Sequence, residues 1–127
     1  MELDHVGIAT PDAAGQAATF AELLDASVVH REEFDGLDVV FVELPSGYLE
    51  LLEPLDDGTV QRFLDREGPG LHHLAFRTDD IEAALAHAEA LGIDRIDAEP
   101  RPGAWGHQVA FLHPGSTGGV LVEFVEH

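Results

Sequence analysis

The stretch HHLAFRTDDIEAALAHAEALG, residues 72–92, decides the fold, because the chain contains its pattern twice. Residues 4–24 read DHVGIATPDAAGQAATFAELL and follow the same order: a histidine, a short apolar run, a threonine and an Ala-rich segment. His5 lies 68 positions before His73, and the threonines of the two copies are separated by the same offset. This common offset indicates an internal repeat in which a strand leads into a helix.

The helix after each strand is predicted by its first residues and by its apolar spacing. We expect Thr10 and Thr78 to be N-caps, because a threonine oxygen can accept a hydrogen bond from a free N–H group at a helix start. Gly92 supplies a stop for the second helix. Apolar residues at helical spacing predict one buried face on each helix. They are Ala17, Phe20, Leu23 and Leu24 in the first copy and Ile81, Leu85, Ala88 and Leu91 in the second.

The ends of the two copies match as well. YLELLEP at 48–54 aligns with LVEFVEH at 121–127, so that Glu50 lies on Glu123. A further apolar segment predicts another strand in each copy. These segments are DVVFVEL, residues 38–44, and HQVAFLH, residues 107–113.

We therefore predict a single α+β domain made of two βαβββ modules. The first module covers residues 1–57 and the second covers residues 70–127. Residues 58–69 form the connector, which we expect to contain a short helix between turns.

Composition limits the partners. The 127 residues carry 25 acidic and 6 basic side chains, all arginine, for a net charge of −19. Such a surface disfavours nucleic acid and anionic membranes, and we interpret it as adaptation to a high-salt cytoplasm, as in a halophilic microbe. There is no cysteine, no apolar run long enough to span a bilayer and no visible secretory signal, so we expect a cytoplasmic protein.

Four repeated residues form the candidate site. Duplicated modules usually pack about a pseudo-two-fold axis, so we expect His5 to face His73 and Glu50 to face Glu123. Neighbouring side chains of a strand point to opposite faces, and the alignment assigns His73 to the site rather than His72.

Two imidazoles and two carboxylates form a suitable site for Co²⁺, Ni²⁺, Mn²⁺, Zn²⁺ or Fe²⁺, with two positions left for a chelating substrate. Glu50 and Glu123 lie in apolar strands, where an unpaired carboxylate is costly, which favours a metal. The alternative is that His5 and His73 are core histidines that bond to the backbone. 

The remaining acidic and histidine residues near these strands are assigned outside the site. We expect Glu53 and Glu126 to face away from the site or lie at strand ends, in solvent. His107 could line the pocket after a glycine-rich loop. The other histidines are predicted to be solvated or terminal; they are His30, His87, His113 and His127.

At these residues the chain resembles the vicinal oxygen chelate superfamily and, within it, the methylmalonyl-CoA epimerases. The resemblance covers nearly the whole chain, through DHVGIA, YLELLEPL, GLHHLAFRTDDI, EPRPGAWGHQVAFLHP and GGVLVEF. It implies a curved mixed sheet around a metal, with the ligands His5, Glu50, His73 and Glu123. It also implies a CoA thioester substrate, a homodimer and Co²⁺ as the first choice of ion, with Mn²⁺, Ni²⁺ and Zn²⁺ as alternatives.

The implied reaction interconverts (R)- and (S)-methylmalonyl-CoA by proton abstraction at C2 through a metal-stabilised enolate. Inversion requires an acid/base group on each side of C2, and Glu123 is one candidate. Some relatives have glutamine at the Glu50 position and a separate catalytic glutamate where this chain has Val39. Glu50 is therefore our hypothesis for the second base, with Asp38 and Glu43 as rivals.

Two features leave the ligand contacts and the activity open. Many relatives have lysine where this chain has Gly115, so Arg101 and the amides of residues 103–107 are candidates for CoA contacts. A glyoxalase I-type lyase acting on a glutathione hemithioacetal would use the same ligand set and enolate chemistry. A non-catalytic ligand-binding member of the superfamily is the alternative from another class.

Overall fold

The structure, a computed structural model, describes residues 1–127. These residues form two compact units, His5–His72 and Met1–Asp4 with His73–His127. None of the three α-helices has the length and apolarity needed to cross a bilayer.

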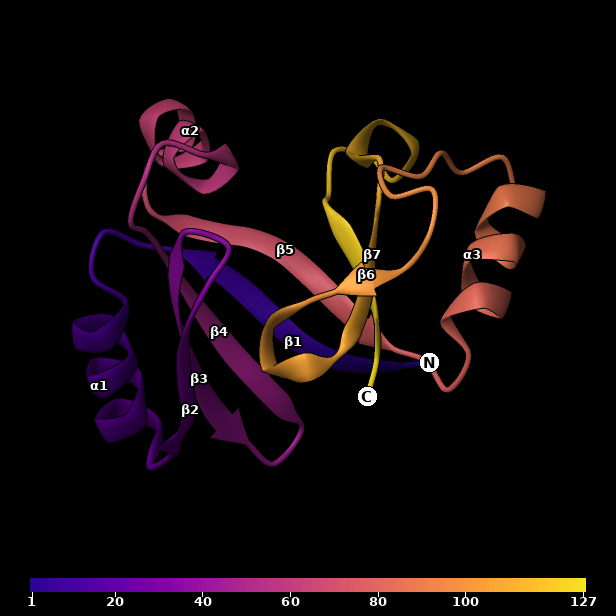
Figure 1. The fold of residues 1–127 in the computed structure, drawn as a ribbon. Coiled ribbons are helices and arrows are strands. Elements are labelled where there is room, and N and C mark those ends of the chain that lie inside the picture. The colour runs from indigo at the N-terminus through magenta and orange to yellow at the C-terminus, as the bar shows by residue number, and fades with distance from the viewer. The chain divides into compact units, whose positions relative to one another are not determined.

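The first module has a helix packed on one face of four strands (Figure 1). Its strands pair in the order β2-β3-β4-β1, with β1 parallel to β4 and the other pairs antiparallel. The connector contains the predicted short helix, α2. The elements are β1 (Glu2–Ala9), α1 (Ala13–Leu24), β2 (Ser27–Phe34), β3 (Leu37–Leu44), β4 (Gly47–Pro54) and α2 (Thr59–Glu67).

The second module repeats this topology. Its strands pair in the order β5-β8-β7-β6, again with the first strand parallel to the last and the other pairs antiparallel. The same pairing order in both modules confirms the predicted α+β fold of two βαβββ units. The elements are β5 (Gly70–Arg77), α3 (Ile81–Ala90), β6 (Arg101–Pro102), β7 (Gln108–Leu112) and β8 (Val122–Glu126), with single 3-10 turns at Ala104–Gly106 and Pro114–Ser116.

The helices begin later than the sequence predicted. Asp12 is the N-cap of α1 and Asp80 that of α3; each side chain accepts a hydrogen bond from the N–H three residues on, at 3.0 Å. Thr10 and Thr78 are therefore not the caps. Each threonine Oγ1 instead accepts the N–H of the capping aspartate, at 3.1 and 3.2 Å respectively, and so orders the turn before the helix.

The sequence predicted only some of the residues on the buried faces of α1 and α3. In α3 the expected residues up to Ala88 are buried, but Leu91 is exposed because it is already the C-cap. In α1 Ala17 is buried, whereas Leu23 and Leu24 are exposed. Leu23 lies about 120° around the helix from Ala17. Leu24 is the last helical residue before the chain turns through the left-handed Asp25.

In each module, the strand side chains that face the helix form a hydrophobic core with it. Ile8, Val40 and Leu51 pack under α1, and Ala110 and Leu112 pack under α3. Because side chains alternate along a strand, the residues between them point to the sheet face opposite the helix. The candidate site residues lie on these opposite faces.

Candidate metal-binding residues and family

The first module contains one buried His–Glu pair. His5 on β1 and Glu50 on β4 are 5% and 6% exposed, and His5 Nε2 lies 3.4 Å from Glu50 Oε1. Phe41 is the partner of Glu50 across β3 and β4. Its ring meets that of His5 edge-on, at 6.0 Å between centroids.

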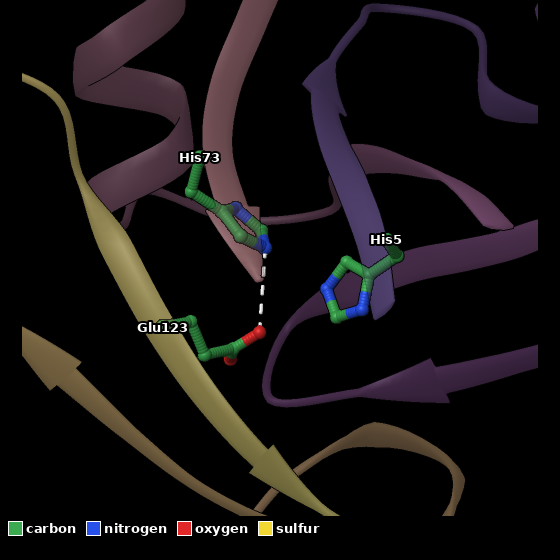
Figure 2. A group of neighbouring side chains, drawn as sticks. All are labelled: His5, His73 and Glu123. Carbon is green, nitrogen blue, oxygen red and sulfur yellow. Dashed lines mark ion pairs between the residues drawn. The ribbon is translucent and has the colours of Figure 1, made fainter. Parts of the chain in front are cut away.

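The second module contains the same arrangement. His73 on β5 and Glu123 on β8 are 5% and 6% exposed, with His73 Nε2 3.5 Å from Glu123 Oε1 (Figure 2). Phe111 is the partner of Glu123 across β7 and β8, and its ring meets His73 edge-on at 5.5 Å. The repeat thus extends from the backbone to a matching trio of histidine, glutamate and phenylalanine in each module.

The neighbouring histidine has a different environment. His72 packs edge-on against Phe63 of α2, with 4.9 Å between the ring centroids. His73 contacts Glu123 and Phe111. The two adjacent histidines therefore contact different residues, because successive side chains of a strand point to opposite faces of the sheet.

Each pair is chemically suited to a divalent transition metal. An imidazole Nε2 and a carboxylate oxygen are both ligands for such ions, and neither unit adds a thiolate, because the chain has no cysteine. Burying a carboxylate is costly unless a cation or hydrogen bonds compensate it. The donors of each pair, His5–Glu50 and His73–Glu123, therefore fit the coordination of a divalent cation.

Glu53 and Glu126 face away from the site, as predicted, but they are only partly exposed and contact the helices rather than lying free in solvent. Each lies three residues beyond a site glutamate, which turns its side chain toward the helix side of the sheet. Glu53 Oε1 accepts the N–H of Ala13 at 2.8 Å, and Glu126 Oε1 accepts that of Ile81 at 2.9 Å. These N–H groups are in the first turn of a helix, where they lack intrahelical partners and where the dipole favours a negative charge.

The two rivals for the second base differ in environment from Glu50. Asp38 is buried on the helix side of the sheet and accepts two hydrogen bonds from Arg31, to Oδ1 at 3.0 Å and to Oδ2 at 2.8 Å. This contact raises the pKa of the Arg31 guanidinium. Glu43 is exposed near the end of β3, opposite Tyr48.

Two polar clusters were missed by sequence reasoning. His30, predicted to be solvated, lies within β2, and its Nε2 is 3.0 Å from Glu32 Oε1. The sequence signal for this contact was the spacing of the two residues, which are two positions apart and therefore on the same face of a strand.

Asp4 is the second such residue. It is buried, and its Oδ1 lies 2.9 Å from Arg77 Nη2 and 2.6 Å from His127 Nε2. No local sequence pattern indicates contacts between residues that are 73 and 123 positions apart in the chain.

His107 packs with other rings of the second unit. Its ring is stacked on His127 at 3.8 Å and on Trp105 at 5.9 Å between centroids. Trp105 has a φ of 63°, a left-handed conformation that only a constrained loop imposes on such a residue. His127, predicted only as terminal, is thus part of the packing that orders the loop before β7.

Comparison with known proteins agrees with this architecture. Residues 4–111 match the model of the Glyoxalase/Bleomycin resistance protein/Dioxygenase superfamily. The chain is 39% identical over 126 residues to the ethylmalonyl-CoA/methylmalonyl-CoA epimerase of Cereibacter sphaeroides, a match that covers 95% of this chain and 94% of the relative. The chain belongs to the methylmalonyl-CoA epimerase family.

Other members of the epimerase family are similar over the same length. The human mitochondrial methylmalonyl-CoA epimerase is 39% identical over 125 residues, covering 95% of this chain and 71% of the relative. The crystal structure of the Mycobacterium tuberculosis methylmalonyl-CoA epimerase superposes with a TM-score of 0.93 at 33% identity, covering 98% of this chain and 87% of that one. The resemblance seen in the sequence is therefore confirmed at the level of family and fold.

Proposed function

We propose that this protein is a metal-dependent epimerase that interconverts (R)- and (S)-methylmalonyl-CoA. Two independent observations support this function. Two relatives that match nearly the whole chain are named as methylmalonyl-CoA epimerases, one of them also as an ethylmalonyl-CoA epimerase. Each module also buries one His–Glu pair at the same position of the repeat. The buried His–Glu pair of each module is the observation that supports the proposal most, because its imidazole and carboxylate can bind a metal ion and its carboxylate can accept a proton.

The proposed ligands are His5, Glu50, His73 and Glu123. Co²⁺ is the ion we expect first, from the family resemblance, with Mn²⁺, Ni²⁺ or Zn²⁺ as alternatives that imidazole and carboxylate donors also bind. A divalent ion bound there would act as a Lewis acid that stabilises negative charge on the thioester oxygen.

The proton transfers are assigned to the two glutamates. In one direction, the Glu123 carboxylate takes the C2 proton, and the electron pair of the broken C–H bond delocalises onto the thioester oxygen. Glu50, which moves off the ion to carry a proton, then gives that proton to the opposite face of C2, which inverts the centre. The reverse reaction uses the same two groups with their roles exchanged.

An assay on a single epimer tests the function. Pure (S)-methylmalonyl-CoA should be converted to an equal mixture with the (R) form by the Co²⁺-loaded protein, measured with an enzyme specific for one epimer. Methylglyoxal with glutathione should give no S-lactoylglutathione. Turnover of the hemithioacetal alone would instead indicate the glyoxalase I-type lyase. Binding of methylmalonyl-CoA without turnover of either substrate would indicate a non-catalytic binding protein.

We further propose that the protein is a cytoplasmic homodimer. The homodimer follows from the family resemblance alone, and the cytoplasm from the sequence composition. Light scattering coupled to size-exclusion chromatography at high salt should give about twice the 13.7 kDa mass of the chain. A mass of a single chain across the concentrations tested would contradict the dimer.

A further inference from the structure

Arg101 lies close to one of the buried pairs in the second module. The Cζ atom of its guanidinium is 5.6 Å from the centroid of the Phe111 ring. The same ring contacts His73 at 5.5 Å, and Phe111 is the strand partner of Glu123. Arg101 is therefore separated from the His73–Glu123 pair by one aromatic side chain.

Asp97 holds Arg101 in this position. Its Oδ1 accepts a hydrogen bond from Arg101 Nε at 3.0 Å, and its Oδ2 accepts the backbone N–H of Phe111 at 2.8 Å. One carboxylate thus ties the arginine to the strand that carries the aromatic ring. This leaves the two Nη nitrogens of Arg101 to an external acceptor, and the side chain is 44% exposed.

The other arginines of the chain are used differently. Arg77 lies at the end of β5, and its Nε and Nη2 both bind the buried Asp4. Most of the rest also pair with acidic side chains; the pairs are Arg31–Asp38, Arg66–Glu67 and Arg95–Glu89. Arg101 alone combines an exposed guanidinium fork with a position beside a buried His–Glu pair.

A cation at this position would favour an anionic substrate for electrostatic reasons. An acyl-CoA thioester with a free carboxylate carries several negative charges, and the protein itself carries a net charge of −19. Long-range repulsion therefore opposes binding, and a local cation must offset it. A guanidinium fork suits carboxylate and phosphate oxygens, and the Phe111 face and the Asp97 contact keep it pre-organised.

We propose that Arg101 binds an anionic oxygen of the acyl-CoA substrate through its Nη nitrogens, and that Asp97 is its positioning residue. This inference rests on the proposed function. The anionic oxygen belongs either to the carboxylate on C2 or to the phosphates of CoA. Both sources offer the same chemistry, and three thioesters separate them.

The test compares Arg101→Gln with Arg66→Gln, which makes the same change in net charge on the exposed surface of α2. Dissociation constants are measured by calorimetry for methylmalonyl-CoA, for propionyl-CoA, which lacks the carboxylate, and for the methylmalonyl thioester of N-acetylcysteamine, which lacks the phosphates. We expect Arg101→Gln to weaken methylmalonyl-CoA binding about tenfold to a hundredfold, as for a lost hydrogen bond to a charged group. Arg66→Gln should change it less than twofold.

The truncated thioesters identify the oxygen. If Arg101 binds the carboxylate, its substitution weakens the N-acetylcysteamine thioester and leaves propionyl-CoA unchanged; if it binds phosphate, the pattern is reversed. Arg101→Lys should recover part of the affinity, because it keeps the charge but not the fork. Asp97→Asn should raise KM more than it lowers kcat.

Two results would overturn the inference. Equal affinities of wild type and Arg101→Gln for all three thioesters, in protein with an unchanged melting temperature, would remove the role of Arg101 and leave the proposed function standing. Wild-type protein that binds none of the thioesters would overturn the proposed function and this inference with it.

Discussion

At the scale of single residues, the two neighbouring histidines provide the most informative comparison. His73 meets Glu123, whereas His72, one position earlier, packs on Phe63. Alternation along β5 is sufficient to separate a candidate ligand from a packing residue. The same contrast supplies a matched pair of variants.

We predict that His5→Ala and His73→Ala each lose bound Co²⁺, because each removes one proposed ligand of the same ion. His72→Ala should retain it. Metal content after dialysis, measured by atomic emission, should fall from one ion per chain to below about 0.1 in the first two variants, since loss of one of four ligands weakens binding steeply. Full metal content in His73→Ala would exclude that residue as a ligand.

The role of Glu50 as a second base can be separated from its role as a ligand. We expect Glu50→Gln to bind metal but to lower kcat for epimerisation by about 100-fold or more, the range for a lost acid/base group. Proton exchange on the Glu123 side of C2 should persist, so one epimer should take up deuterium without inversion. Wild-type kcat with the metal retained would eliminate Glu50 as a base.

At the scale of elements, the strands that carry the site glutamates are tied to the helices behind them. Glu53 at the end of β4 accepts the first-turn N–H of α1, and Glu126 at the end of β8 does so for α3. In each module, one strand therefore presents a glutamate to the site and another to a helix start, three residues apart. This geometry connects helix docking with the position of the site.

Removing this contact should destabilise the first module. We predict that Glu53→Ala lowers the free energy of unfolding by about 1 kcal/mol, as for a lost helix cap. Glu22→Ala is the control, since it removes the same charge from the exposed surface of α1. Urea unfolding measures both. Equal stabilities of the two variants would show that the Glu53 contact has no energetic role.

The elements also show which features could be predicted from the sequence. The repeat of His5 with His73 at an offset of 68, and of Glu50 with Glu123 at an offset of 73, predicted the two βαβββ modules, since each offset constrains several positions together. The helix starts were misplaced because Thr10 and Asp12 are both suitable caps, and only the path of the chain selects Asp12.

Pairings across strands were less accessible to sequence reasoning. His30 was assigned to solvent because the sequence placed it at a loop edge, whereas its contact with Glu32 depends on the strand β2. Asp4 binds a histidine 123 positions away, a partner that no local pattern indicates. The contact between Arg101 and Phe111 likewise required the register of β6 and β7.

At the scale of the whole molecule, the net charge of −19 is the feature expected to make stability depend on salt. With 25 acidic and 6 basic side chains, the folded chain repels itself at low ionic strength. Screening shortens from about 10 Å at 0.1 M salt to about 3 Å at 1 M, so added salt should relieve this repulsion.

We therefore predict that the melting temperature rises by several degrees between 0.1 and 2 M KCl, measured by calorimetry. Most of the rise should be complete by about 1 M if screening is its cause. An equal concentration of an uncharged osmolyte provides the control. A melting temperature that is constant or falls with KCl would contradict the proposed adaptation to salt.

The central claim is that two duplicated His–Glu pairs hold one cation that makes the C2 proton of a malonyl thioester acidic. Deuterium exchange at C2 of methylmalonyl-CoA, followed by mass spectrometry in D₂O, tests it most directly. Metal-stripped protein should give no exchange above the buffer rate, and one equivalent of Co²⁺ per chain should restore it together with inversion. Equally fast exchange by the stripped protein, or none after reconstitution, would contradict the claim.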